Sequence, residues 1–177
     1  MPPKVLIVDD DETARLVLAG LLKRLGCWCV LAADEVQARN RLNEHDFELA
    51  LVGINLSDNL GLGMLRYALT EYPQMATLVV ASVDDPVVVD AALEAGVYGY
   101  LVKPLRAEEL FVNVSCALRR RSLEIKQRAS VKWLTRAVHE RTNELFEARE
   151  RLVLVEKQLE GFPRRPSLKP RGVANDD

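Results

Sequence analysis

The stretch that decides the fold is Val5–Asp11, which reads VLIVDDD. Its four consecutive apolar residues are apolar on both faces of a strand, which is typical of a buried strand in a parallel sheet. The next segment places Leu18, Leu21, Leu22 and Leu25 at the spacing of an amphipathic helix, which Gly26 ends. The sequence therefore predicts a buried strand, an acidic turn and a helix packed against the strand.

The same alternation of an apolar run and an amphipathic segment recurs through about residue 118. Strands are predicted at 5–8, 27–31, 47–52, 77–81 and 98–102. Helices are predicted from an Asp34 cap through Arg41, over 64–71 before Pro73, over 87–95 after Asp84-Asp85-Pro86, and from Glu108 onward. Five strand–helix alternations indicate an α/β fold, a doubly wound five-stranded parallel sheet. In such sheets function lies at the carboxyl ends of the strands, where Asp9, Asp10, Ser82 and Lys103 are found.

Composition and charge indicate two physical units. The chain has 177 residues, of which 49% are hydrophobic and 28% charged, with a net charge of −2. This excludes a collagen-like or wholly disordered chain and leaves no room for a large additional catalytic domain. Residues 1–115 hold 9 basic and 17 acidic side chains, whereas residues 116–177 hold 15 basic and 9 acidic ones. We interpret this asymmetry as an acidic domain followed by a basic helix and tail.

Targeting and redox features are sparse. The N-terminus lacks the pattern of a secretory signal, and no apolar run reaches the roughly 18 residues of a membrane span. Cys27, Cys29 and Cys116 have no partner pair at metal-ligand spacing, so we interpret Cys27 and Cys29 as small buried hydrophobes. A reducing, cytoplasmic setting without membrane association is therefore expected.

Four motifs in order make residues 4–118 resemble the receiver domain of two-component response regulators, which has a flavodoxin-like fold. The motifs are the run ending in Asp9-Asp10, the strand 47–52 with Gly61 closing its loop, Ser82 after Val79-Val80, and the segment 95–104 with Tyr100 and Lys103-Pro104. The resemblance implies phosphoryl transfer to an aspartate after the third strand, with Mg²⁺ held by the acidic pair. It further implies Asp9 and Asp10 as that pair, Ser82 and Tyr100 as switch residues, and Lys103 as the phosphoryl-binding lysine.

The implied acceptor position falls on Gly53, which has no side chain to act as a nucleophile. Asp58 lies too far along the loop to replace it, Ser57 stands where the family usually has proline, and Asn55 offers only a backbone carbonyl to a cation. Loss of one carboxylate ligand should weaken any Mg²⁺ binding, and no cofactor is required. We expect Lys103 to pair with Asp9 or Asp10 instead, and we expect a pseudo-receiver that is not phosphorylated at this site and is not an enzyme.

The long helix predicted over 108–160 carries a heptad pattern. Apolar residues at alternating spacings of three and four define the a and d positions of a coiled coil: Val131, Leu134, Val138, Leu145, Ala148, Leu152, Val155, Leu159 and Phe162, with Arg141 as the one polar member. The g-to-e pairs Glu144–Arg149 and Arg151–Glu156 have opposite signs, which favours a parallel homodimer. A heterotypic coil, or a helix that folds back on its own domain, remains an alternative.

Three units are therefore predicted: a receiver-like domain over 1–118, a basic helix and coiled coil over 119–162, and a disordered Pro/Arg tail over 163–177. The preferred function is a phosphorylation-independent signalling adaptor that contacts a histidine kinase or an output protein. The alternatives are phosphorylation at an unconventional residue, and nucleic-acid binding through the basic segment around Arg119-Arg120-Arg121. His139-Glu140 resembles a kinase phosphorylation box, but it lacks the proline and the partner helix, so we interpret His139 as an exposed coil residue.

Overall fold

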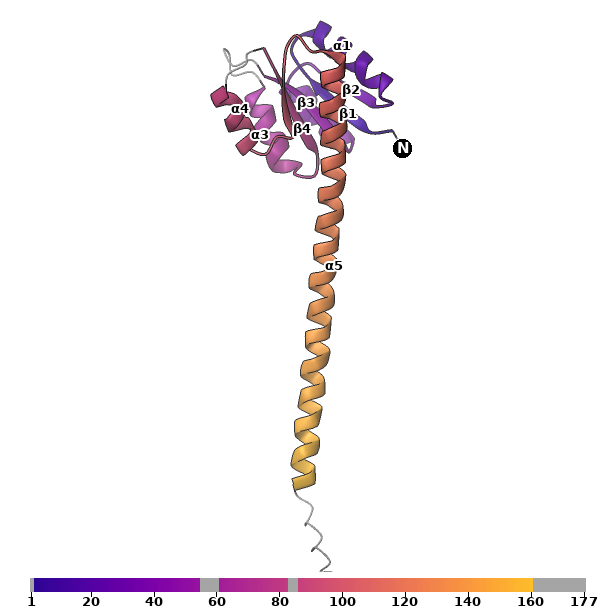
Figure 1. Cartoon of the computed structure of the whole chain (residues 1–177), viewed down its shortest axis with the longest axis vertical. Helices are drawn as coiled ribbons and strands as arrows, with labels where there is room; N and C mark the ends of the chain where they lie inside the picture. The colour runs from indigo at the N-terminus through magenta and orange to yellow at the C-terminus, as the bar shows by residue number, and fades with distance from the viewer. Residues whose placement is uncertain (1, 55–60, 83–85, 161–177) are drawn as a thin grey trace, which may run out of the picture. The chain divides into compact units, whose positions relative to one another are not determined.

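The structure is a computed structural model that describes residues 2–54, 61–82 and 86–160, without the side chains of 86–88 and 159–160 (Figure 1). Strands and helices alternate along the chain as predicted. In order they are β1 (Lys4–Val8), α1 (Glu12–Arg24), β2 (Trp28–Ala32), α2 (Glu35–Glu44), β3 (Leu49–Ile54), α3 (Leu62–Glu71), β4 (Ala76–Ala81), α4 (Pro86–Glu94), β5 (Gly99–Val102) and α5 (Ala107–Glu160).

The five strands form one parallel sheet in the order β2-β1-β3-β4-β5, which confirms the predicted fold class. The strand order reverses direction at β1, because the chain moves outward to β2 and then back across β1 to β3. Val8, at the end of β1, lies opposite Ala32 on one side and Val52 on the other. Residues that follow β1 and those at the end of β3 are therefore neighbours in space.

Each face of the sheet is covered by helices that bury an apolar cluster. The face under α2, α3 and α4 packs residues such as Leu6, Val52 and Met64, and the face under α1 and α5 packs Leu22 and Leu51 (Figure 1). α5 packs against the sheet through three buried residues: Leu110, Val114 and Ala117. Burial of this kind on both faces is the main source of stability for such a sheet.

Of the two cysteines predicted to be small buried hydrophobes, Cys27 is buried and Cys29 is partly buried, while Cys116 is exposed. All three thiols are free, and Cys27 is buried in the cluster under α1 and α5. Burial raises the pKa of the Cys27 thiol and, together with the charge of Cys27, raises that of Cys29 to about 11. Both thiols are therefore protonated at neutral pH, which disfavours reactive or metal-binding chemistry at this strand.

Several boundaries differ from prediction by one to three residues, and two of these differences have clear local reasons. β3 continues through Gly53 to Ile54, two residues beyond the predicted end, because Gly53 and Ile54 pair with Val80 and Ala81 of β4. α3 begins at Leu62 rather than Met64, directly after Gly61 in the left-handed region at φ 85°. A Cβ at Gly61 would collide with the carbonyl oxygen of Gly53. Glycine is thus required at position 61, which lies against the end of β3.

The first compact unit runs to Arg128, beyond the predicted boundary at residue 118. Two arginines of α5 explain the extension, because Arg121 Nε donates to the Gln74 carbonyl at 2.6 Å and Arg128 Nη1 to the Pro73 carbonyl at 3.4 Å. A third, Arg120, binds Glu124 at 2.8 Å and stacks over the Tyr98 ring. The basic segment of α5 is thus bound to the residues before β4 and to Tyr98.

Tyr98 and Glu124 form a hydrogen bond that gives this contact a pH dependence. The bond and the Arg120 guanidinium lower the pKa of Glu124, while burial and the same bond raise the pKa of Tyr98. A lowered carboxyl pKa contributes stability above its unfolded value and loses it as the pH falls through the folded value. A raised tyrosine pKa contributes stability at neutral pH and loses it as the pH rises through the folded value.

We expect Tyr98→Phe to lower the free energy of unfolding by less than about 1 kcal/mol near neutral pH, because Glu124 is partly solvated. The difference from wild type should shrink at acidic pH and again above the tyrosine pKa. Denaturant unfolding across the pH range measures it. Glu140→Gln, which alters an exposed ion pair with Arg136 at 2.9 Å, is the control. If the difference in unfolding free energy between Tyr98→Phe and wild type were constant with pH, the Tyr98–Glu124 bond would not be the source of the pH dependence.

The second unit comprises the described part of α5 from residue 129 onward. The predicted a and d residues Val131, Leu134, Val138, Leu145, Leu152 and Val155 are all at least half exposed in this single chain. The side chain of Leu159, Phe162 and the predicted tail lie outside the described residues. Of the helices that the structure describes, none combines the length and apolar character needed to cross a membrane.

Candidate functional site

The side chain of Asp9 forms a buried ion pair with Lys103 at the carboxyl ends of the strands. Asp9 follows β1 and Lys103 follows β5, and Lys103 Nζ lies 2.6 Å from Asp9 Oδ2. The Asp9 side chain is 1% exposed and that of Lys103 is 27% exposed. The other carboxylate oxygen, Oδ1, accepts a hydrogen bond from the Asp11 amide at 3.0 Å. Both oxygens of Asp9 therefore have partners within the chain, as a buried carboxylate requires.

Gly53 provides the space in which the Asp9 carboxylate lies. A Cβ built at Gly53 would sit 2.8 Å from Asp9 Cγ, closer than such atoms approach in real proteins. A side chain at position 53 would therefore require the Asp9 carboxylate to shift from the position in which it binds Lys103. The absence of a side chain at Gly53 thus leaves room for the ion pair. The expected pairing of Lys103 with one of the two acids after the first strand is observed with Asp9.

Asp10 and Arg15 complete the turn after β1. Asp10 is exposed, unlike Asp9. Arg15 Nη1 donates to the carbonyl oxygens of Asp9 at 2.6 Å and of Asp10 at 3.1 Å. Sequence analysis missed Arg15. A signal was available, because Arg15 lies one helical turn beyond Asp11, whose side chain caps α1 by accepting from the Thr13 amide at 2.8 Å. Arg15 therefore holds the backbone of the acidic pair.

A cavity of about 370 Å³ opens beside the pair. Its described lining includes three glycines, Gly53, Gly61 and Gly63, and the acidic residues Asp9, Asp10, Asp34 and Glu35. Glu35 is held by Arg39 at 2.6 Å, and the Arg39 guanidinium stacks on Tyr67 with its carbon 3.6 Å from the ring centre. The one residue of β3 in this lining is Gly53, so β3 supplies no nucleophile to the cavity.

The residues present do not fit Mg²⁺. This cation requires several oxygen ligands in near-octahedral geometry. Asp9 already binds Lys103 and the Asp11 amide, and Gly53 supplies no carboxylate. Within residues 2–54, 61–82 and 86–160, no group of three acidic, histidine or cysteine side chains is arranged to hold a metal ion. A divalent cation would have to displace Lys103 from Asp9 before it gained even one buried ligand.

The remaining predicted residues lie around the same edge. Ser82 directly follows β4 and is exposed, while Lys103 is held beside that strand end by its amide, which donates to the Ala81 carbonyl at 2.8 Å. Tyr100 lies within β5 opposite Val79 and packs partly buried against the cluster under α2, α3 and α4. Asn55, Ser57 and Asp58, and the helix start at Asp84-Asp85, lie outside the described residues.

Comparison with known proteins identifies relatives of the first unit. Residues 5–115 match the family model of the response regulator receiver domain. The chain is 33% identical over 119 residues to Protein PetR of Rhodobacter capsulatus, covering 67% of the chain and 50% of that protein. It is 28% identical over 158 residues to a cyclic di-GMP phosphodiesterase of Thermotoga maritima, covering 89% of the chain and 39% of that protein. This chain therefore spans half or less of the length of these two relatives.

A similar solved structure is that of a CheY-like response regulator receiver domain protein from Methanospirillum hungatei. It matches with a TM-score of 0.64 and 26% sequence identity, covering 70% of this chain and 99% of that one. Another is a two-component response regulator from Clostridium difficile, with a TM-score of 0.61 and 27% identity over 67% of this chain. The matched part of this chain is thus the size of a complete receiver domain.

Proposed function

The chain belongs to the response regulator receiver domain family, and from that premise we propose that it signals as an adaptor without phosphorylation at position 53, dimerised through residues 129–162. A receiver of this kind acts by presenting a surface rather than by carrying a phosphoryl group. Its partners in this proposal are the protein components of a two-component pathway, a histidine kinase or an output protein.

The single observation that carries the proposal is the Asp9–Lys103 ion pair built over Gly53. Transfer to a receiver aspartate needs a carboxylate nucleophile and a cation that neutralises the developing charge. Here position 53 has no side chain, and the lysine available for a phosphoryl oxygen is bound to Asp9 at 2.6 Å. The same pair joins the ends of β1 and β5 without a phosphoryl group, which supports one persistent conformation at this edge.

Dimerisation is supported by the exposed heptad stripe of α5. Leu145 and Leu152 at successive a positions are 71% and 63% exposed in the single chain. Helices in proteins derive most of their stability from packing an apolar face, so an exposed stripe of this length favours a partner helix. Opposite charges at the predicted g-to-e pairs Glu144–Arg149 and Arg151–Glu156 favour a parallel second copy.

Nucleic-acid binding is less well supported by the same helix. Arg120, Arg121 and Arg128 already bind groups of the first unit, namely the Glu124 carboxylate and two backbone carbonyls. Phosphate contacts through these arginines would first have to break those interactions. A salt-dependent shift of duplex DNA by the full chain would favour the nucleic-acid alternative.

Incubation with acetyl phosphate and Mg²⁺ is expected to leave the intact mass of the wild-type chain unchanged. Gly53→Asp is the matched control, because it restores a carboxylate nucleophile beside Asp9 and Lys103, and we expect it to gain one phosphoryl group. Intact-mass spectrometry under conditions that preserve acyl phosphates measures both. A stoichiometric phosphoryl group on the wild-type chain, mapped to the loops that follow the strands, would favour phosphorylation at an unconventional residue instead.

A further inference from the structure

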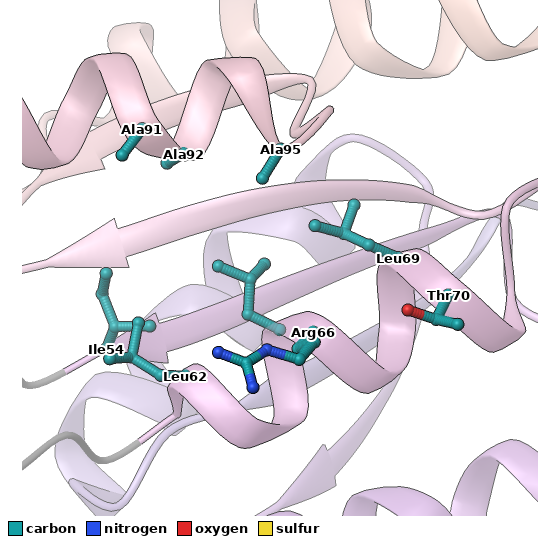
Figure 2. Close-up of a pocket in the computed structure, with 9 residues that line it drawn as sticks. Ile54, Leu62, Arg66, Leu69, Thr70, Ala91, Ala92 and Ala95 are labelled. Atoms are coloured by element: carbon teal, nitrogen blue, oxygen red, sulfur yellow. The ribbon is translucent and has the colours of Figure 1, made fainter.

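An apolar groove of about 400 Å³ lies between α3 and α4, away from the Asp9–Lys103 pair. Three leucines of α3 and Ile54 of β3 form one side, and Ala91 and Ala92 of α4 with Ala95 directly after it form the other (Figure 2). The volume falls within the range of small-molecule sites in proteins. Such a volume, with walls that are mostly apolar, is suited to an apolar ligand.

The groove exists because the described residues that line its α4 side carry only methyl groups. Ala91, Ala92 and Ala95 face Leu62 and Leu69 across the gap (Figure 2). Ala92 is buried, whereas Ala91 and Ala95 are exposed, so the two helices do not close over the leucines. The groove thus depends on the small size of these alanines. Substituting larger residues for them would fill the space.

Among the described residues, one charged side chain lines the groove. Arg66 of α3 is exposed, and its guanidinium extends along the helix toward Leu62 (Figure 2). No ion pair or hydrogen bond links Arg66 to another residue in the described part of the chain. Thr70, one turn further along α3, adds a hydroxyl. The described lining therefore combines an apolar surface, one cation without a described partner, and no acidic side chain.

We propose that this groove binds a medium-chain aliphatic carboxylate, with the chain against the leucines and alanines and the carboxylate on Arg66. The single guanidinium complements one anionic head group, and its fork of donors suits a carboxylate. A more polar ligand would leave its groups unpaired against the apolar walls. From Leu62 to Leu69 the α3 wall spans ~10 Å, which suits a medium rather than a long chain.

Titration of the full chain with hexanoate, octanoate and decanoate tests the proposal, with each probe kept below its micelle concentration. Calorimetry and the shifts of leucine and isoleucine methyl signals give the affinity and the location. We expect about a fourfold gain in affinity per added methylene, and tighter binding of octanoate than of octanol or octylammonium. Absence of saturable binding, or affinity that does not change with chain length, would overturn the proposal.

Variants place the binding in the groove. Ala91→Leu should abolish binding of every probe. If the circular dichroism of this variant shows that it has not folded, Ala95→Leu replaces it as the groove-filling variant. Arg66→Ala should weaken octanoate about two- to fivefold and leave octanol unchanged. The matched controls are Arg106→Ala, at an exposed arginine outside the groove, and Ala129→Leu, at an exposed alanine of α5. Binding that survives both groove-filling variants, or that falls equally with Arg106→Ala, would overturn the assignment.

Discussion

Leu145→Asp is expected to convert the proposed dimer into a monomer and to lower the helix content of residues 129–160. Leu145 is an a position in the middle of the heptad stripe and is 71% exposed in the single chain. In a dimer each copy buries this leucine side chain, and its burial stabilises the dimer by about 2 kcal/mol per chain. Two substituted copies therefore lose about 4 kcal/mol, which raises the dimer dissociation constant about a thousandfold. Sedimentation equilibrium and circular dichroism measure the two effects.

Phe146→Asp is the matched control for this substitution. Phe146 is the next residue, is also exposed at 63%, and lies at a b position outside the stripe. We expect the Phe146→Asp chain to sediment as a dimer with the helix content of wild type. Loss of the dimer with Phe146→Asp but not with Leu145→Asp would place the contact on another face of α5. A wild-type chain that sediments as a monomer would remove the dimer from the proposal.

The orientation of the two helices has its own test. In a parallel, in-register dimer the two copies of an a residue face each other, within reach of a disulfide. We therefore expect Leu152→Cys, in a chain that also carries Cys116→Ser because Cys116 is exposed, to form an intermolecular disulfide on mild oxidation. An antiparallel pair would separate the two residue-152 side chains and give no such product.

Most of the fold follows from local patterns. The apolar run 5–8 predicts β1, and the Asp34 cap is present, since its carboxylate accepts from the Gln37 amide at 2.7 Å. Patterns of this kind depend on spacing along the chain, which is directly visible. The contacts of Arg121 and Arg128 were not predictable in this way, because their acceptors are backbone carbonyls of distant residues. Every residue carries such a carbonyl, so only the packing of α5 selects Gln74 and Pro73.

The residues of the site were predictable from the sequence, but their burial and contacts were not. Asp9 and Lys103 were identified from their places after two strands and Gly53 from the resemblance to receiver domains, and the pairing of Lys103 with one of two acids was expected. Which acid depends on the pleat, which buries Asp9 and exposes Asp10. The space for the Asp9 carboxylate likewise depends on the register that brings Gly53 beside it. The α3–α4 groove depends on the separation of two helices, which no periodicity encodes.

Lys103→Met is expected to destabilise the first unit by about 2–3 kcal/mol, because it leaves the Asp9 carboxylate buried with only the Asp11 amide as a partner. Arg136→Met is the matched control. It breaks a pair of similar length, 2.9 Å to Glu140, but those side chains are 82% and 60% exposed. Exposed pairs contribute little, so we expect less than about 0.5 kcal/mol there. Denaturant unfolding of the full chain measures both changes.

The double variant Lys103→Met/Asp9→Asn distinguishes a specific ion pair from general damage to the turn after β5. Asparagine keeps the shape of Asp9 without its charge, so no unpaired charge remains buried, and the double variant should be more stable than Lys103→Met alone. A favourable coupling of about 1–3 kcal/mol between the two changes is expected. Additive losses would contradict this account. A coupling of the expected size would mean that the ion pair, rather than a divalent cation, holds the ends of β1 and β5 together.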